Sequence, residues 1–213
     1  DAVSAVGATA GVSIILSAQS EGFSITGGSA ADTLTGGSGS DSFIGFVGAD
    51  TVTGGASADT IVLTVTSIDL NNASDSQLLN VEAVSASGAS AGVAVTLSSQ
   101  SEGFSITGGS AADTITGGSG ADSIVAGSGD DVINGFVGAD TIDGGAGSDT
   151  IVLTSTSTTL NTAADTAIAN VEAVSASGAT AAVSVTLTAQ TEGFSITGGS
   201  AADTLTGGSG NDS

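Results

Sequence analysis

The segment Gly108–Val152 reads GGSAADTIT, GGSGADSIV, AGSGDDVIN, GFVGADTID and GGAGSDTIV, which are five consecutive nonapeptides. Asp occupies the sixth place of all five, and Ile occupies the eighth. Four more nonapeptides fill residues 27–62, and the pattern begins again at Gly198. A period this short and regular predicts a solenoid in which each repeat forms one turn and one short strand.

A longer repeat encloses the nonapeptides. SEGFSITGGSAADT begins at Ser20 and at Ser101, and TEGFSITGGSAADT begins at Thr191, which gives spacings of 81 and 90 residues. The second spacing is longer because the second cassette has one more nonapeptide than the first. The chain therefore divides into flanking β coils (1–26), a first cassette (27–62), an inter-cassette β segment (63–107), a second cassette (108–152), a second inter-cassette β segment (153–197) and the start of a third cassette (198–213).

The residue types within each nonapeptide favour a turn followed by a strand. Glycine and aspartate suit turns, whereas the β-branched residues that follow suit a strand. We expect the eighth-place residues to point inward; they are Leu34, Phe43, Val52, Ile61, Ile115, Ile124, Ile133, Ile142, Ile151 and Leu205.

The inter-cassette segments contain strand-like runs of their own, at Val81–Ser85, Val93–Leu97 and Phe104–Thr107 and in the matching copy at Val171–Ser175, Val183–Leu187 and Phe194–Thr197. We expect irregular coils of the same solenoid there, with a short helical turn at Asn72–Leu79 and another at Thr162–Ile168.

The charge of the chain is entirely negative. Its 213 residues include 22 Asp and Glu and no Lys, Arg or His. Repulsion among these carboxylates opposes compaction, so the neutralising cations must come from outside, and divalent metal is the leading candidate. A chain without basic residues is a poor partner for nucleic acid or an anionic membrane surface. No apolar run is long enough for membrane insertion.

Catalysis is not expected from this composition. General acid–base chemistry usually draws on His, Lys, Cys or Tyr, and none of them occurs in the chain. Only carboxylates remain, and the repeated turns account for most of them. We therefore expect that the chain is not an enzyme.

The nonapeptides resemble the RTX (repeats-in-toxin, hemolysin-type) calcium-binding repeat G-G-x-G-x-D-x-U-x, in which U is a large apolar residue. The hexapeptide part matches fully in four turns, which begin at Gly36, Gly117, Gly144 and Gly207. GGSAAD and GGASAD lack the glycine at the fourth place, and GFVGAD has Phe46 or Phe136 at the second place. The resemblance implies an all-β fold, a parallel β-roll or β-solenoid with two nonapeptides per coil, and calcium bound in the turns.

The candidate calcium ligands are the sixth-place aspartates and the glycines of three fully matching turns. They are Asp32, Asp41, Asp50, Asp59, Asp113, Asp122, Asp131, Asp140, Asp149, Asp203 and Asp212, with Gly36, Gly39, Gly117, Gly120, Gly144 and Gly147. In a β-roll a turn lies over the second turn after it, which predicts the pairs Asp32–Asp50, Asp41–Asp59, Asp113–Asp131, Asp122–Asp140 and Asp131–Asp149. The alternative is a calcium-free solenoid with solvated turns.

Two further groups of residues recur at fixed places. Glu21, Glu102 and Glu192 precede the cassettes, where each either caps the first calcium site or is a solvated turn residue. Phe23, Phe104 and Phe194 are expected in the core. Phe46 and Phe136 replace a turn glycine, so we expect them to face outward or to contact another chain.

These features predict a calcium-binding structural repeat region of a secreted bacterial cell-surface protein. The chain also resembles bacterial surface-layer proteins and large adhesins, which implies type I secretion, folding on extracellular calcium and self-association with identical chains. Two alternatives stay open: the stalk of a large RTX adhesin, and the calcium-dependent secretion or folding module of an RTX toxin or hydrolase. The recurrence of cassettes argues against that module, which typically has one cassette. The first residue is not Met and the last lie within a repeat, so we expect a piece of a longer protein.

Overall fold

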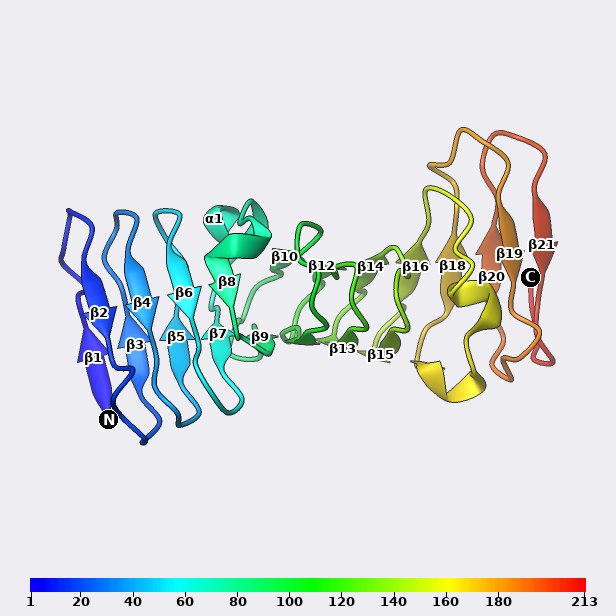
Figure 1. The fold of residues 1–213 in the computed structure, drawn as a ribbon. Helices are drawn as coiled ribbons and strands as arrows, with labels where there is room; N and C mark the ends of the chain where they lie inside the picture. The colour runs from blue at the N-terminus through cyan, green and yellow to red at the C-terminus, as the bar shows by residue number, and fades with distance from the viewer.

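The computed structural model describes residues 1–213 as an elongated solenoid of short parallel strands, with the two termini at opposite ends (Figure 1). The strands are β1 (Ala2–Ser4), β2 (Ser13–Ile15), β3 (Ser24–Thr26), β4 (Thr33–Thr35), β5 (Ser42–Ile44), β6 (Thr51–Thr53), β7 (Thr60–Val62), β8 (Leu78–Leu79), β9 (Ala83–Ser85), β10 (Ala94–Thr96), β11 (Ser105–Thr107), β12 (Thr114–Thr116), β13 (Ser123–Ser128), β14 (Val132–Asn134), β15 (Thr141–Ala146), β16 (Thr150–Val152), β17 (Ile168–Ala169), β18 (Ala173–Ser175), β19 (Ser184–Thr186), β20 (Ser195–Thr197) and β21 (Thr204–Thr206). The helical segments are α1 (Ile68–Asn71), η1 (Asp75–Gln77), η2 (Leu160–Thr162) and η3 (Asp165–Ala167).

Each coil of the solenoid contains two strands, so the strands that pair are two apart in the chain. Odd-numbered strands β1 to β17 form one nine-stranded sheet. Even-numbered strands form a four-stranded sheet from β2 to β8 and a six-stranded sheet from β10 to β20, while β19 pairs with β21. Within a cassette the register is two nonapeptides, as in Thr33 with Thr51 and Thr114 with Val132, and every pair is parallel. The predicted parallel β-solenoid is confirmed.

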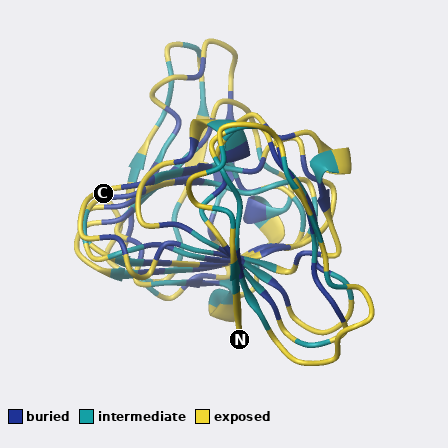
Figure 2. Ribbon diagram, turned by 90° about the vertical axis from the view of Figure 1, so that its left-hand side faces the viewer, coloured by how far each residue is buried: buried dark blue, intermediate teal, exposed yellow.

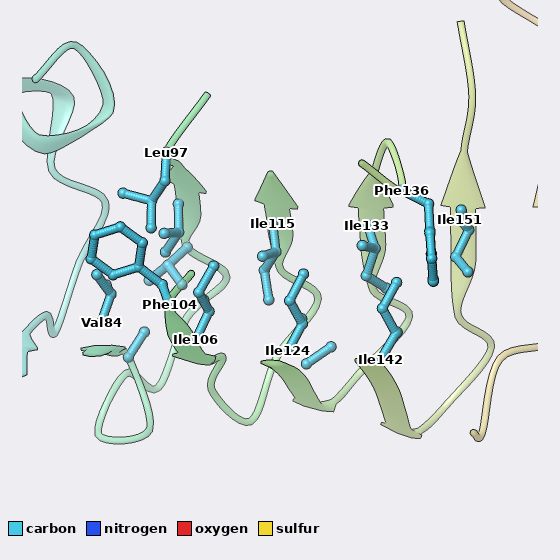
Figure 3. Close-up of a cluster of buried hydrophobic side chains, with 14 of the residues drawn as sticks. Val84, Leu97, Phe104, Ile106, Ile115, Ile124, Ile133, Phe136, Ile142 and Ile151 are labelled. Carbon is cyan, nitrogen blue, oxygen red and sulfur yellow. The ribbon is translucent and has the colours of Figure 1, made fainter. Parts of the chain in front are cut away.

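The centre of each short strand contributes an inward residue to the core, and apolar residues of the turns and insertions, such as Leu63, Leu97 and Phe104, complete it. Figure 3 shows Ile115, Ile133 and Ile151 from one sheet facing Ile124 and Ile142 from the other. All predicted inward residues are buried except Leu205, which belongs to the last strand and is 43% exposed. Figure 2 shows the solenoid from the left-hand end of Figure 1. Buried residues follow the inside of the coils, and exposed residues follow the turns.

The inter-cassette segments continue the same solenoid, as predicted. β9 pairs with β7 of the first cassette and β11 pairs with β9, so that Val84 lies between Ile61 and Ile106, whereas β10 pairs with β12 of the second cassette. The helical turns predicted at 72–79 and 162–168 are found as η1 and η3, and a further helical segment, α1 or η2, precedes each one. The Ser67 hydroxyl accepts a bond from the Leu70 N–H at 3.0 Å, which starts α1 at Ile68. No helix in the chain has the length and apolar character of a membrane span.

The outward placement expected for Phe46 and Phe136 is wrong. Both are buried, at 1% and 2% exposure, beneath the inter-cassette segments. The Ser67 hydroxyl donates to the carbonyl of Phe46, and the Ser157 hydroxyl donates to that of Phe136. The inserted segment covers each aromatic ring, which the nonapeptide pattern could not show. Phe104 and Phe194 are buried as expected, whereas Phe23 is partly buried.

The two helical insertions lie on opposite sides of the solenoid. The first connects β7 to β8, which joins the even-numbered strands, and the second connects β16 to β17, which joins the odd-numbered ones. In Figure 1, α1 projects upward and the second insertion (yellow) projects downward.

Candidate calcium-binding corners

Turns on the two sides of the solenoid stack into four corners, two in each cassette, and we name each corner after one residue that it contains. The Glu82 corner contains residues 36–41, 54–59 and 80–82, and the Phe46 corner contains 27–32, 45–50 and the insertion 63–77. The Glu172 corner contains residues 108–113, 126–131, 144–149 and 170–172, and the Phe136 corner contains 117–122, 135–140 and 153–167.

The sixth-place aspartates form a ladder along each corner. In every pair, the Oδ1 atom of the later Asp accepts a hydrogen bond from the backbone N–H of the Asp one coil earlier. The five predicted pairs are brought together in this way: Asp32–Asp50 at 2.9 Å, Asp41–Asp59 at 2.7 Å, Asp113–Asp131 at 2.7 Å, Asp122–Asp140 at 3.0 Å and Asp131–Asp149 at 2.8 Å. The contact joins carboxylate to backbone rather than two carboxylates to each other.

The ladder extends to residues outside the nonapeptide pairs. The Oδ1 atoms of Asp203 and Asp212 accept from the N–H groups of Val183 and Phe194, both at 2.9 Å. Each aspartate is therefore tied to the coil before it. The function of these carboxylates in the fold is to join adjacent coils at their turns.

The second carboxylate oxygen has two kinds of environment. In most turns the Oδ2 atom accepts from an N–H of its own turn, and we call these turns closed. The closed contacts include Gly37 to Asp41 at 2.8 Å, Gly118 to Asp122 at 2.8 Å, Gly199 to Asp203 at 2.6 Å and Val137 to Asp140 at 2.9 Å.

Three turns are open. The Oδ2 atoms of Asp59, Asp131 and Asp149 are buried and have no hydrogen-bond partner. In these turns the second-place glycine is left-handed, with φ of +125° at Gly55, +117° at Gly127 and +96° at Gly145. A buried, unpartnered carboxylate oxygen is costly, so these are the positions where an external cation has most to offer.

The buried aspartates are hard to ionise in the absence of metal. Burial is the main cause that raises the pKa of Asp59 to about 6; the carboxylates of Asp41 and Glu82 add to it, and the bond from the Asp41 N–H opposes it. Burial likewise raises the pKa of Asp50, Asp122, Asp131, Asp140 and Asp149. A bound cation would reverse this effect, because it favours the charged carboxylate.

The donor set fits calcium. The chain offers only oxygen ligands, which excludes the nitrogen and sulfur sites typical of zinc or copper. No three acidic side chains gather in one place, so a metal would take most of its ligands from backbone carbonyls of the turns. Calcium accepts such mixed carbonyl and carboxylate sites. The unpartnered Oδ2 atoms of the open turns supply the charged ligands.

The predicted glycines are required by close packing in the turns. A Cβ atom at Gly36, Gly117 or Gly144 would lie against the carboxylate of its own turn. A Cβ at Gly39, Gly120 or Gly147 would overlap the backbone of the neighbouring coil. These glycines therefore hold the turns close to one another; their role as carbonyl ligands stays a prediction.

The glutamates that precede the cassettes accept no hydrogen bond from a ladder N–H. Glu21 and Glu102 are exposed, and their carboxylates accept only from the adjacent N–H groups of Ser20 and Ser101, at 3.4 and 3.2 Å. Glu192 is half-buried, and its Oε2 atom is buried without a hydrogen-bond partner. Whether these glutamates cap a calcium site stays a prediction. Sequence reasoning instead missed Glu82 and Glu172, which end the ladder at the other boundary of each cassette. The identical NVEAVSASGA stretches at Asn80 and Asn170 were the available signal.

Parallel coils, glycine-rich turns and a ladder of buried aspartates define the class of calcium-binding β-rolls. A family model for the RTX calcium-binding nonapeptide repeat matches the chain in four copies, over residues 26–61, 105–133, 116–151 and 195–213. The chain therefore contains RTX calcium-binding repeats, and the ion that this repeat family binds is calcium. A search of curated proteins and a search of solved structures each found no match.

Proposed function

We propose that this calcium-binding structural repeat region belongs to a secreted bacterial cell-surface protein, where it forms part of a surface layer, sheath or filament. The observation that carries the proposal is the set of buried, unpartnered carboxylate oxygens in a chain with no basic side chain. Such a chain folds where calcium is plentiful and stays open where calcium is scarce, which matches passage from the cytoplasm to the outside.

The proposed role is structural rather than catalytic. Most of the acidic residues that an enzyme would use for proton transfer are instead held by backbone N–H groups in the ladder, and His, Lys, Cys and Tyr do not occur in the sequence. The recurrence of cassettes supports a long repetitive assembly over a single secretion module. Self-association with identical chains is part of the proposal, since both ends of a solenoid offer unpaired strands.

Circular dichroism with light scattering, recorded while calcium is added to the chelated chain, tests this function. We expect a cooperative gain of β signal accompanied by increased scattering. A gain of β signal in a species that stays monomeric would support the adhesin stalk instead. Full β signal in the chelated chain would contradict the dependence on calcium.

A further inference from the structure

The segment Asn80–Glu82 occupies the place of a nonapeptide turn although its sequence is not one. Inside the Glu82 corner, the carbonyl of Gly54 lies against the Cα of Gly36, and the carbonyl of Asn80 lies in the same way against the Cα of Gly54. Asn80 is left-handed, with φ of +49°. Asn80, Val81 and Glu82 therefore take the place of six residues. In a regular turn, those six run from the first glycine to the aspartate.

Glu82 takes the part of the missing aspartate. Its Oε2 atom accepts from the Asp59 N–H at 2.8 Å, just as the Asp59 Oδ1 atom accepts from the Asp41 N–H at 2.7 Å. The longer side chain of Glu compensates for the shortened turn. The Glu82 N–H also donates to the Asp59 carbonyl at 3.1 Å, which fixes the two residues against each other.

The second cassette repeats the arrangement independently. Glu172 Oε2 accepts from the Asp149 N–H at 2.7 Å, the Glu172 N–H donates to the Asp149 carbonyl at 3.1 Å, and Asn170 has φ of +51°. The two cassettes differ in length and in the side of the solenoid on which they end. The shared ending therefore belongs to the NVE segment and not to one particular corner.

An unpartnered carboxylate oxygen marks both places. Asp59 and Asp149 are each 0% exposed, and their Oδ2 atoms have no hydrogen-bond partner. A Cβ atom added to Gly54 would meet both Asp59 Oδ2 and the Asn80 carbonyl, so these two oxygens converge on one spot. Gly144 is in the same position between Asp149 Oδ2 and the Asn170 carbonyl.

We propose that Glu82 with Asp59, and Glu172 with Asp149, each complete a calcium site at the end of a cassette. The nonapeptide pattern assigns no ligand to the NVE segments, so these terminal sites add to the sites of the repeat. They would tie the first coil of the inter-cassette segment to calcium. The inference rests on the proposed calcium-dependent fold.

Counting bound calcium by equilibrium dialysis against ⁴⁵Ca tests the terminal sites. The Glu82→Gln/Glu172→Gln variant keeps an acceptor oxygen for the Asp N–H but loses the charge, and we expect it to bind two calcium ions fewer than the unchanged chain. Glu172→Gln alone should lose one. The matched control Glu21→Gln/Glu102→Gln removes two exposed glutamates outside the ladder and should lose none.

A second variant separates ligand loss from damage to the fold. If Asp149 and Glu172 hold the same ion, Asp149→Asn alone should already lose that ion, and adding Glu172→Gln to it should lose no further calcium. An unchanged calcium count in the Glu82→Gln/Glu172→Gln variant, with the unchanged chain binding calcium, overturns the terminal sites only. Absence of calcium binding to the unchanged chain overturns the proposed function itself.

Discussion

The two corners of the second cassette use the same repeat in different ways. At the Glu172 corner, the turns of Asp131 and Asp149 are open and the stack ends on a carboxylate. At the Phe136 corner, the turns of Asp122 and Asp140 are closed by N–H groups and the stack ends on a buried aromatic ring. At the Glu172 corner the second carboxylate oxygens of these two aspartates have no partner within the chain, whereas at the Phe136 corner backbone N–H groups satisfy them.

A full match to the repeat pattern does not decide which kind of turn forms. GGSGAD at Gly117 is closed, whereas GGAGSD at Gly144 is open with Gly145 left-handed. The open turns of the second cassette stack directly on each other, and their strands extend to pair Gly127 with Gly145.

The largest effect is expected from a substitution at the Phe136 corner. Replacing Phe136 with Ala should cost about 3–5 kcal/mol of unfolding free energy, because it empties a buried aromatic site beneath the insertion. Urea denaturation in saturating calcium measures it. Val137→Ala is the matched control, since Val137 is 55% exposed, and should change stability by less than about 0.5 kcal/mol. Equal effects of the two substitutions would contradict the burial of the ring.

The next largest effect is expected from a substitution at the Glu172 corner. Gly147 has φ of +142°, and a Cβ there would overlap the Gly129 carbonyl, so Gly147→Ala should cost about 2–3 kcal/mol. Gly178→Ala is the control, because nothing lies within 4 Å of its added Cβ. Thermal unfolding of both variants in calcium compares them; a neutral Gly147→Ala would show that the left-handed turn is not required.

Substituting an aspartate at each corner sharpens the comparison. Asp149→Asn should weaken calcium binding about tenfold, or about 1.4 kcal/mol, because its Oδ2 has no other partner. Asp122→Asn should leave calcium binding nearly unchanged and lower stability in saturating calcium, since the Gly118 N–H loses its carboxylate acceptor. Calcium titrations of both variants followed by circular dichroism decide the point, and equal shifts in the calcium midpoint would argue against two kinds of turn.

The smallest expected effect is a pH dependence of the metal-free chain. The pKa of Asp59 is raised from 3.8 to about 6, so the folded state binds more protons than the unfolded state in that range. The contribution to stability is fully present below about pH 4 and is lost as the pH rises through about 6. Circular dichroism of the chelated chain across this window should show a residual β signal that falls with increasing pH, and Asp59→Asn should flatten the decline.

Much of the fold could be predicted because the period of nine is unbroken. The Asp column placed every turn, and alternation placed the inward residues such as Ile115 and Ile133. The position of Phe136 could not be predicted, because it depends on an insertion that folds back over its own cassette. Glu172 was missed for a related reason. Its side chain belongs to the ladder, but its own segment does not follow the nonapeptide spacing.

One nonapeptide is half a coil, so the number of repeats in a cassette decides on which side of the solenoid the next segment begins. After four repeats the chain is back on the side where the cassette started, and after five repeats it is on the opposite side. The first insertion and the second thus project in opposite directions, although their sequences are close copies. Deleting one nonapeptide from the second cassette would turn everything after it by half a revolution and align the two projections. Gain or loss of a single repeat therefore redirects a surface without altering any residue on it.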